Sequence, residues 1–307
     1  MTLVNLVREM SNGERNTLIP SQIAEYVKWG NFDTISKILK SGHFTVTYIT
    51  GLSGNGKTTM VEQVCANLKR ECIRVNITAE TDEDDLLGGM RLIDGNTQFV
   101  YGPVIEAMRR GSVLLLDEVD LGSDKLMCLQ PVLEGKGIYL KKINEFIQPA
   151  KGFAVVATAN TKGRGGDHSD RFVGTKILNE AFLDRYNFTI EQEYPPRATE
   201  ERIVKKYMES MNVQDEGFAD KLVRWADIIR KSFYEGAVDD VISTRRLIDI
   251  VKGYSIFGNK EVAIKLALAR FDVSVAEGFY TLYSKLDDNM VQDGPAQNQN
   301  QNQNEKE

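Results

Sequence analysis

Residues 48–59 read YITGLSGNGKTT and carry the most informative pattern in the chain. The octet 51–58 fits G-x-x-x-x-G-K-[S/T], and a short apolar run precedes it. Glycines in the octet permit backbone turns that are closed to residues with a Cβ, so that successive N–H groups can point at one anion. A helix expected over about 57–69 would present its positive end to the same anion. The pattern therefore predicts a phosphate-binding loop, or P-loop, between a strand and a helix.

The residue types of this loop indicate a nucleotide site. The Lys57 ammonium would bind the β- and γ-phosphates, and the Thr58 hydroxyl would be a ligand of Mg²⁺. A chance match in a glycine-rich turn is the alternative, and the expected strand before the loop and helix after it disfavour that alternative. The predicted nucleotide-binding residues are Gly51, Ser53, Gly54, Asn55, Gly56, Lys57, Thr58 and Thr59.

Short apolar runs alternate with segments of helical spacing from about residue 44 onward. Such runs, separated by helices, are typical of a parallel sheet that is covered on both faces. In these sheets the ligand lies beyond the carboxyl ends of the strands. We therefore predict an α/β fold with three layers and a five-stranded parallel sheet. The expected strands are 44–50, 72–77, 111–117, 153–158 and 188–190.

Polar residues follow the third and fourth of these runs and precede the fifth. Asp117 and Glu118 end the third strand in the Walker B pattern, where Asp117 would hold Mg²⁺ and Glu118 would polarise the water that attacks the γ-phosphate. The alternative for this pair is a buried strand that ends in exposed acids. Asn160 follows the fourth strand, and its amide could bind the same water or the γ-phosphate. Arg185 precedes the fifth strand and is placed to act as an arginine finger on a neighbour's nucleotide, the alternative being an ion pair with Asp184 or another acid.

The segments GLSGNGKT, VLLLDE, VATAN and LDRY, in this order and spacing, resemble an AAA+ ATPase domain. More narrowly they resemble the MoxR-like and dynein-related branch, and within it the CobS-type subunit of cobaltochelatase. The resemblance spans about 45–195 and implies ATP and Mg²⁺ as cofactors, Asn160 as sensor 1 and Arg185 as the finger. Arg164 and Arg171 depart from the family's pattern, and either could compete with Arg185 or contact a substrate.

The remaining segments lie before and after this domain in the sequence. Residues 1–40 show helical spacing and predict a helical lead-in to the ATPase domain at 41–195. Residues 196–290 predict a helical lid, in which 243–247 resembles the sensor 2 motif, with Arg245 as the nucleotide-contacting residue. Arg246 or a purely structural salt bridge is the alternative for that motif. The Gln/Asn-rich residues 291–307 are of low complexity, and we expect them to be disordered.

Two expected hairpins suit the same branch, in which they project toward a central pore. They cover 88–101 and 137–147, and Lys141, Lys142 and the loop 92–98 are candidates for contact with a partner. Solvated surface hairpins are the alternative.

Composition narrows the class of protein. The formal net charge of −6 disfavours a protein that coats nucleic acid or binds to the surface of an acidic membrane. Three scattered cysteines and two histidines indicate neither a zinc site nor a disulfide framework, and free thiols suit the cytoplasm. We find no signal peptide and no run long enough to span a membrane.

The resemblance implies a chaperone-like, ATP-hydrolysing motor that forms a homo-oligomeric ring, expected to be a hexamer. Such a motor would remodel a partner protein or assist metal insertion, with a von Willebrand-type protein as a possible partner. A nucleic-acid motor or restriction-type NTPase subunit is the alternative, and a nucleotide-regulated scaffold without turnover is a third hypothesis.

Overall fold

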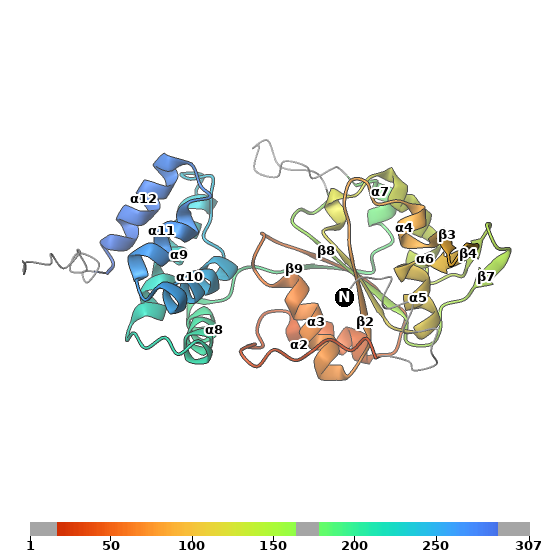
Figure 1. The fold of residues 1–307 in the computed structure, drawn as a ribbon, viewed down its shortest axis with the longest axis horizontal. Helices are drawn as coiled ribbons and strands as arrows, with labels where there is room; N and C mark the ends of the chain where they lie inside the picture. Colours follow the sequence, from red (N-terminus) through yellow and green to blue (C-terminus); the bar gives the residue numbers. More distant parts are fainter. Residues whose placement is uncertain (1–16, 164–177, 288–307) are drawn as a thin grey trace, which may run out of the picture. The chain divides into compact units, whose positions relative to one another are not determined.

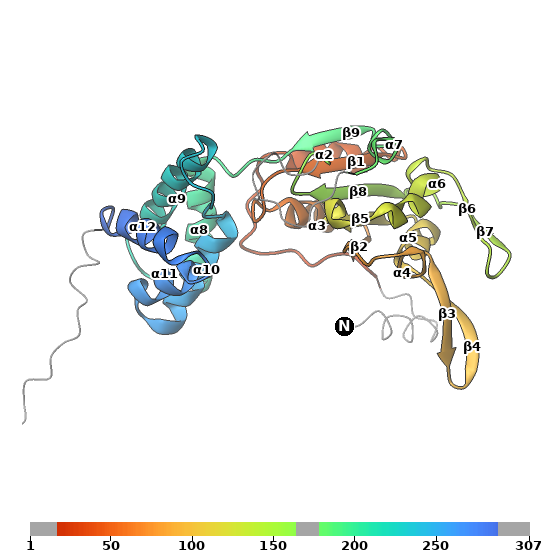
Figure 2. The same ribbon diagram turned by 90° about the horizontal axis from the view of Figure 1, so that it is seen from above.

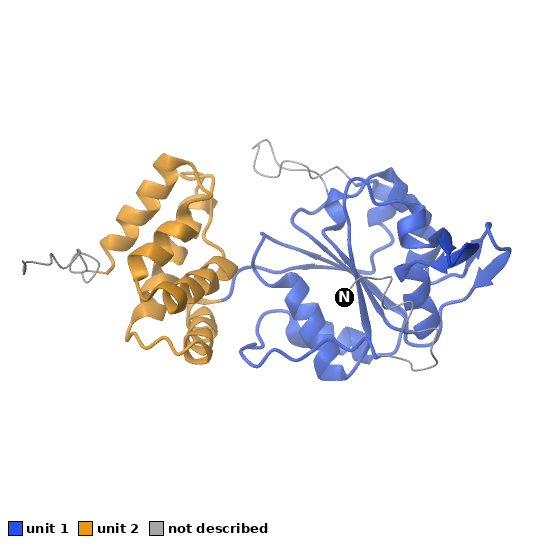
Figure 3. Ribbon diagram, viewed as in Figure 1, with its two compact units in different colours: residues 1–195 blue, residues 196–307 orange. Residues whose placement is uncertain are grey.

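The computed structural model describes residues 17–163 and 178–287, and it divides the chain into two compact units (Figure 3). The first unit comprises 1–195 and the second 196–307. Arg164, Arg171 and the Gln/Asn-rich segment lie outside the described residues, so the predictions made for them stay predictions.

A parallel sheet forms the centre of the first unit (Figure 1). Its strand order, β2-β5-β8-β1-β9, confirms the predicted five-stranded parallel sheet, with strand ends that differ from the prediction by one or two residues. In register, Asn76 lies opposite Asp117 and Thr50 opposite Ala159, so the carboxyl ends of neighbouring strands share one edge. The strands are β1 (Val46–Thr50), β2 (Cys72–Asn76), β5 (Val113–Asp117), β8 (Ala154–Ala159) and β9 (Phe188–Glu191).

Helices cover both faces of this sheet, as the apolar strands require. Side chains alternate along β5, where Leu115 packs with α2 (Phe32–Lys40) and α3 (Lys57–Leu68), and Leu116 packs on the opposite face. Figure 1 shows the two groups of helices on the two sides of the sheet. The second group consists of α4 (Glu83–Leu86), α5 (Pro103–Arg110), α6 (Gln130–Leu133) and α7 (Glu180–Leu183), with the short 3₁₀ turns η1 (Val119–Leu121) and η2 (Asp124–Leu129).

Residues 17–40, the described part of the N-terminal segment, are only partly helical. Of the helical lead-in predicted for 1–40, α2 is present at Phe32–Lys40, whereas residues 17–30 contain no helix. Backbone groups there bond to the ATPase domain instead of to one another: the Ile23 N–H donates to Gln63 Oε1 at 2.9 Å, and the Leu18 carbonyl accepts from the Cys72 N–H at 3.0 Å. Tertiary bonds have therefore replaced the helix that the local spacing favoured.

Both predicted hairpins are present, β3 (Gly88–Ile93) with β4 (Asn96–Tyr101) and β6 (Ile138–Leu140) with β7 (Glu145–Ile147). Figure 2 shows them extending beyond the sheet at one end of the unit. The Tyr101 hydroxyl, at the base of the first hairpin, donates to Glu145, which lies beside the turn of the second hairpin. Their apolar residues Leu92 and Phe146 are exposed, with 76% of Leu92 accessible.

The described part of the second unit is helical, as predicted. Its helices are α8 (Arg197–Ser210), α9 (Phe218–Tyr234), α10 (Thr244–Phe257), α11 (Lys260–Leu268) and α12 (Val273–Ser284). They enclose a core of their own around Trp225 and Tyr283. Helix α8 begins at Arg197, directly after Pro195 and Pro196, and Pro196 is its N-cap residue. Among residues 17–163 and 178–287, no helix combines the length and apolar character needed to cross a membrane.

Candidate active site

The P-loop connects β1 to α3 and requires glycine at two positions for different reasons. Gly51 has φ 146°, and a Cβ there would lie 2.0 Å from the Gln192 carbonyl oxygen. Gly56 has φ 88° at the N-cap of α3, and its requirement is conformational because an added Cβ would meet nothing within 4 Å. The open space beside Gly56 and the start of α3 together leave the loop N–H groups able to face an anion.

Lys57 and Asn160 are in contact at the edge of the sheet where the strands have their carboxyl ends. The buried Lys57 side chain donates from Nζ to the carbonyl oxygens of Gly51 at 2.6 Å and Leu52 at 3.0 Å, and to Asn160 Oδ1 at 3.2 Å. The amide oxygen of Asn160 is therefore turned toward Lys57, which leaves its Nδ2 as the donor available to a ligand.

Asp117 joins the loop to its neighbouring strands. Its Oδ1 accepts from Thr58 Oγ1 at 2.7 Å and also from the Thr158 hydroxyl. Its Oδ2 pairs with the Arg74 guanidinium at 2.5 Å. A carboxylate and a hydroxyl in contact at the edge of a phosphate-binding loop form an oxygen donor set that fits Mg²⁺.

Glu118 lies directly after Asp117 and is half-buried. Its backbone adopts the left-handed conformation, with φ 59°, which is uncommon for a residue other than glycine. The Glu118 N–H donates to Thr158 Oγ1 at 3.3 Å, and η1 begins at the next residue. Its carboxylate has no hydrogen-bond or ion-pair partner in the described stretches of the chain. The sharp turn thus ends β5 and places the predicted water-polarising residue beside Asp117.

Asp120 is a residue that the sequence analysis missed. It is fully buried, and its Oδ2 accepts from the N–H groups of Asn160 and Thr161 at 2.9 Å each and from Thr161 Oγ1 at 3.0 Å. The Tyr48 hydroxyl donates to the Thr161 carbonyl at 2.9 Å, and burial together with the Asp120 charge raises the pKa of Tyr48, so Tyr48 stays a neutral donor. The sequence signal that could have identified Asp120 is the second aspartate in Asp-Glu-Val-Asp at 117–120.

Replacement of Asp120 tests how firmly it holds the Asn160 turn. We expect Asp120→Ala to lower the free energy of unfolding of the first unit by roughly 2–4 kcal/mol, because two buried N–H groups lose their acceptor. Asp120→Asn keeps an acceptor oxygen and should cost less than half as much. The measurement is urea unfolding followed by hydrogen exchange in peptides from β1, β5 and β8. Equal losses in both variants would show that the charge, not the acceptor, matters.

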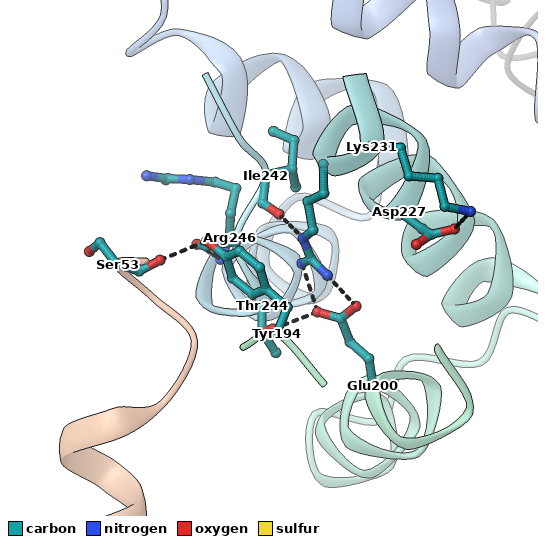
Figure 4. Close-up of polar contacts among 10 residues, drawn as sticks. Ser53, Tyr194, Glu200, Asp227, Lys231, Ile242, Thr244 and Arg246 are labelled. Atoms are coloured by element: carbon teal, nitrogen blue, oxygen red, sulfur yellow. Dashed lines mark hydrogen bonds and ion pairs between the residues drawn. The ribbon is translucent and has the colours of Figure 1, made fainter. Parts of the chain in front are cut away.

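The segment after β9 anchors the other side of the P-loop. Asn55 Nδ2 donates to the Gln192 carbonyl at 2.5 Å. The Tyr194 hydroxyl donates to the Ser53 carbonyl at 2.8 Å, as Figure 4 shows. Gln192 is itself buried and accepts from Asn31 Nδ2 at 2.9 Å. The loop is therefore fixed on both flanks by residues far away in sequence.

Arg185 lies apart from the P-loop contacts within its own chain. Its guanidinium pairs with Glu134 Oε1 at 2.9–3.0 Å and donates to the Ala181 carbonyl. Lys136 and then Arg185 hold the pKa of the Glu134 carboxyl below its ordinary value. The ion pair that competed with the finger hypothesis is therefore present in the single chain, with Glu134 as partner in place of Asp184.

Arg245 lies in the first turn of α10 in the second unit. Ser243 caps this helix by accepting from the Arg246 N–H at 3.2 Å. The Arg246 side chain pairs with Asp249 at 3.5 Å, whereas Arg245 is exposed and has no polar partner among the residues that the structure describes. Arg246, the alternative for the sensor 2 role, is thus paired within α10, whereas Arg245 is available to a ligand.

Known proteins resemble this chain in sequence and in fold. Residues 47–173 match the family model described as AAA domain (dynein-related subfamily). The aerobic cobaltochelatase subunit CobS of Sinorhizobium sp is 32% identical over 241 residues, which cover 76% of this chain and 72% of that protein. An uncharacterized protein of Staphylococcus haemolyticus, SH1500, is 28% identical over 214 residues, which cover 66% of this chain and 75% of that relative.

Among solved structures, NtrX from Brucella abortus in complex with ADP has a TM-score of 0.54 and 14% sequence identity to this chain. The match covers 92% of this chain and 66% of that one. At this identity the likeness concerns the fold alone.

Proposed function

The chain belongs to the AAA+ ATPases of the dynein-related, CobS-like type, and on this premise we propose that it hydrolyses ATP with Mg²⁺ as the motor of a homo-oligomeric ring. The observation that supports the proposal most directly is the convergence of Lys57 with Asn160 and of Thr58 with Asp117 at one edge of the sheet. NtrX, which shares the fold, is bound to ADP in its solved structure.

Each residue of the site has its own role in the proposed ATP hydrolysis. Lys57 and the loop N–H groups bind the phosphates, while Thr58 and Asp117 would hold Mg²⁺, which when bound offsets the charge of the β- and γ-phosphates. The Glu118 carboxylate orients the attacking water and accepts its proton, and Asn160 Nδ2 donates to that water or to the γ-phosphate. In the proposed ring, Arg185 of the next subunit and Arg245 of the lid neutralise charge as the γ-phosphate leaves.

The proposed work of the ring is to remodel a partner protein or to help insert a metal ion, and the name of the cobaltochelatase relative supports the second of these roles. We propose six subunits, a cytoplasmic location that suits the three free thiols, and a von Willebrand-type partner. A nucleic-acid motor is the second candidate, and the net charge of −6 disfavours it.

The function is tested by ATP turnover of the full chain. We expect phosphate release that depends on Mg²⁺, is abolished by EDTA and does not respond to single-stranded DNA or RNA. Stimulation by a nucleic acid would favour the second candidate. Binding of ATP with no hydrolysis at any protein concentration would contradict the motor proposal and leave a nucleotide-regulated scaffold.

A further inference from the structure

A buried polar cluster joins three helices of the second unit (Figure 4). Arg230 of α9 donates from its two terminal nitrogens to the two carboxylate oxygens of Glu200 of α8, at 2.7 and 2.8 Å. Thr244, the first residue of α10, donates its hydroxyl to Glu200 Oε1. Arg230 Nε donates to the Ile242 carbonyl at 2.8 Å. One carboxylate and one guanidinium therefore connect α8 and α9 to the residues on both sides of the Ser243 cap.

Stability alone does not account for charges at this position. The Glu200 and Arg230 side chains are 1% and 7% exposed, so their desolvation costs much of what their attraction gains. Apolar residues of similar volume often stabilise such a site equally well. What apolar residues do not supply is a fixed orientation, because a bidentate pair sets both the distance and the angle between the elements that carry it.

The position of the cluster shows which part of the lid this fixed orientation would affect. Glu200 lies in the first turn of α8, a few residues after the boundary between the units at Pro195 and Pro196. Thr244 immediately precedes Arg245, which is exposed at the start of α10. The cluster therefore ties the point at which the chain enters the lid to the turn that carries the predicted nucleotide-contacting arginine.

We propose that Glu200 and Arg230 are positioning residues for Arg245: through Thr244 and Ile242 they fix the first turn of α10 and hence the direction of the Arg245 side chain during ATP hydrolysis. This inference rests on the proposed function, in which Arg245 contacts the γ-phosphate. Glu200 and Arg230 touch neither nucleotide nor water in this scheme, and they act through the helix start alone.

The same unit contains a second buried charge cluster that serves as a control. Asp287 is fully buried and pairs with Lys221 at 2.6 Å and Lys260 at 3.5 Å, and it accepts from the Tyr283 hydroxyl at 3.2 Å. It joins α9 and α11 to the end of α12, away from the first turn of α10. Loss of this cluster should therefore reduce lid stability without redirecting Arg245.

The experiment compares kcat with lid stability in full-length variants that also carry Trp29→Phe, so that fluorescence reports the buried Trp225 in the lid. We expect Glu200→Gln and Thr244→Val to lower kcat roughly tenfold with KM for ATP changed less than about threefold. Asp287→Asn should shift the urea midpoint of the lid by a similar amount to Glu200→Gln and leave kcat within about twofold. Thr244→Val keeps the charge pair and so tests the link even where Glu200→Gln fails to fold.

A double-variant cycle separates the inference from its premise. Arg245→Ala should lower kcat, and Glu200→Gln or Thr244→Val added to it should lower kcat no further, because they act through the residue already removed. Additive losses in kcat would overturn the inference. If Arg245→Ala lowers kcat while Glu200→Gln and Thr244→Val do not, only the inference is wrong. If Arg245→Ala leaves kcat unchanged, the proposed role of Arg245 is wrong.

Discussion

Glu118→Gln is expected to reduce kcat for ATP hydrolysis by roughly 10²–10⁴-fold while Kd for ATP changes less than about threefold. Glutamine keeps the size of the side chain but neither accepts a proton nor polarises water as a carboxylate does. The backbone at Glu118 is held in its left-handed turn by β5, by the bond to Thr158 and by η1, so the substitution should not move the turn. Binding should survive because Lys57, Thr58 and Asp117 are unchanged.

The measurement combines single-turnover phosphate release with binding of a fluorescent ATP analogue. Glu191→Gln is the matched control, because Glu191 ends β9 at the same edge of the sheet and pairs with Lys162 at 2.8 Å. It should leave kcat within about twofold. A Glu118→Gln protein that retains more than about a tenth of wild-type turnover would show that another group activates the water.

The sheet and its loop could be predicted because their signals are local. The glycine pattern of the P-loop, the apolar run before it and the acids after Leu116 each lie within a few residues of one another. Parallel strands then bring their carboxyl ends to one edge, so that Lys57 contacts Asn160 and Thr58 contacts Asp117. No long-range information had to be read from the sequence to predict this.

The partners that complete the site could not be predicted in the same way. Thr158 was expected only as part of a strand, yet its hydroxyl bonds to Asp117, a residue of the neighbouring strand. Arg74 reaches Asp117 from β2, and Asp120 holds the turn at Asn160 from a position forty residues away. These contacts depend on the strand order β2-β5-β8, which periodicity does not specify.

Arg185→Ala is expected to lower ATP turnover by roughly 10³-fold, the effect of losing an arginine finger. In the single chain Arg185 pairs with Glu134, and both side chains are partly exposed. Because exposed ion pairs contribute little to stability, Arg185 can exchange Glu134 for a neighbour's phosphate at small cost. Glu134→Gln should therefore fold normally and keep turnover within about threefold, whereas a purely structural Arg185–Glu134 pair predicts equal losses for both variants.

Mixed rings decide whether Arg185 acts on its own nucleotide or on that of the next subunit. Arg185→Ala and Lys57→Ala subunits should each be inactive alone, since one lacks the finger and the other lacks the phosphate-binding lysine. In an equal mixture, about a quarter of the subunit interfaces unite an intact Lys57 with an intact Arg185, provided that subunits assemble at random around a head-to-tail ring. Turnover should recover to about that fraction of the wild-type value. Mixtures that stay inactive, although both variants enter one ring, would assign Arg185 to its own chain and direct the same test to Arg164 and Arg171.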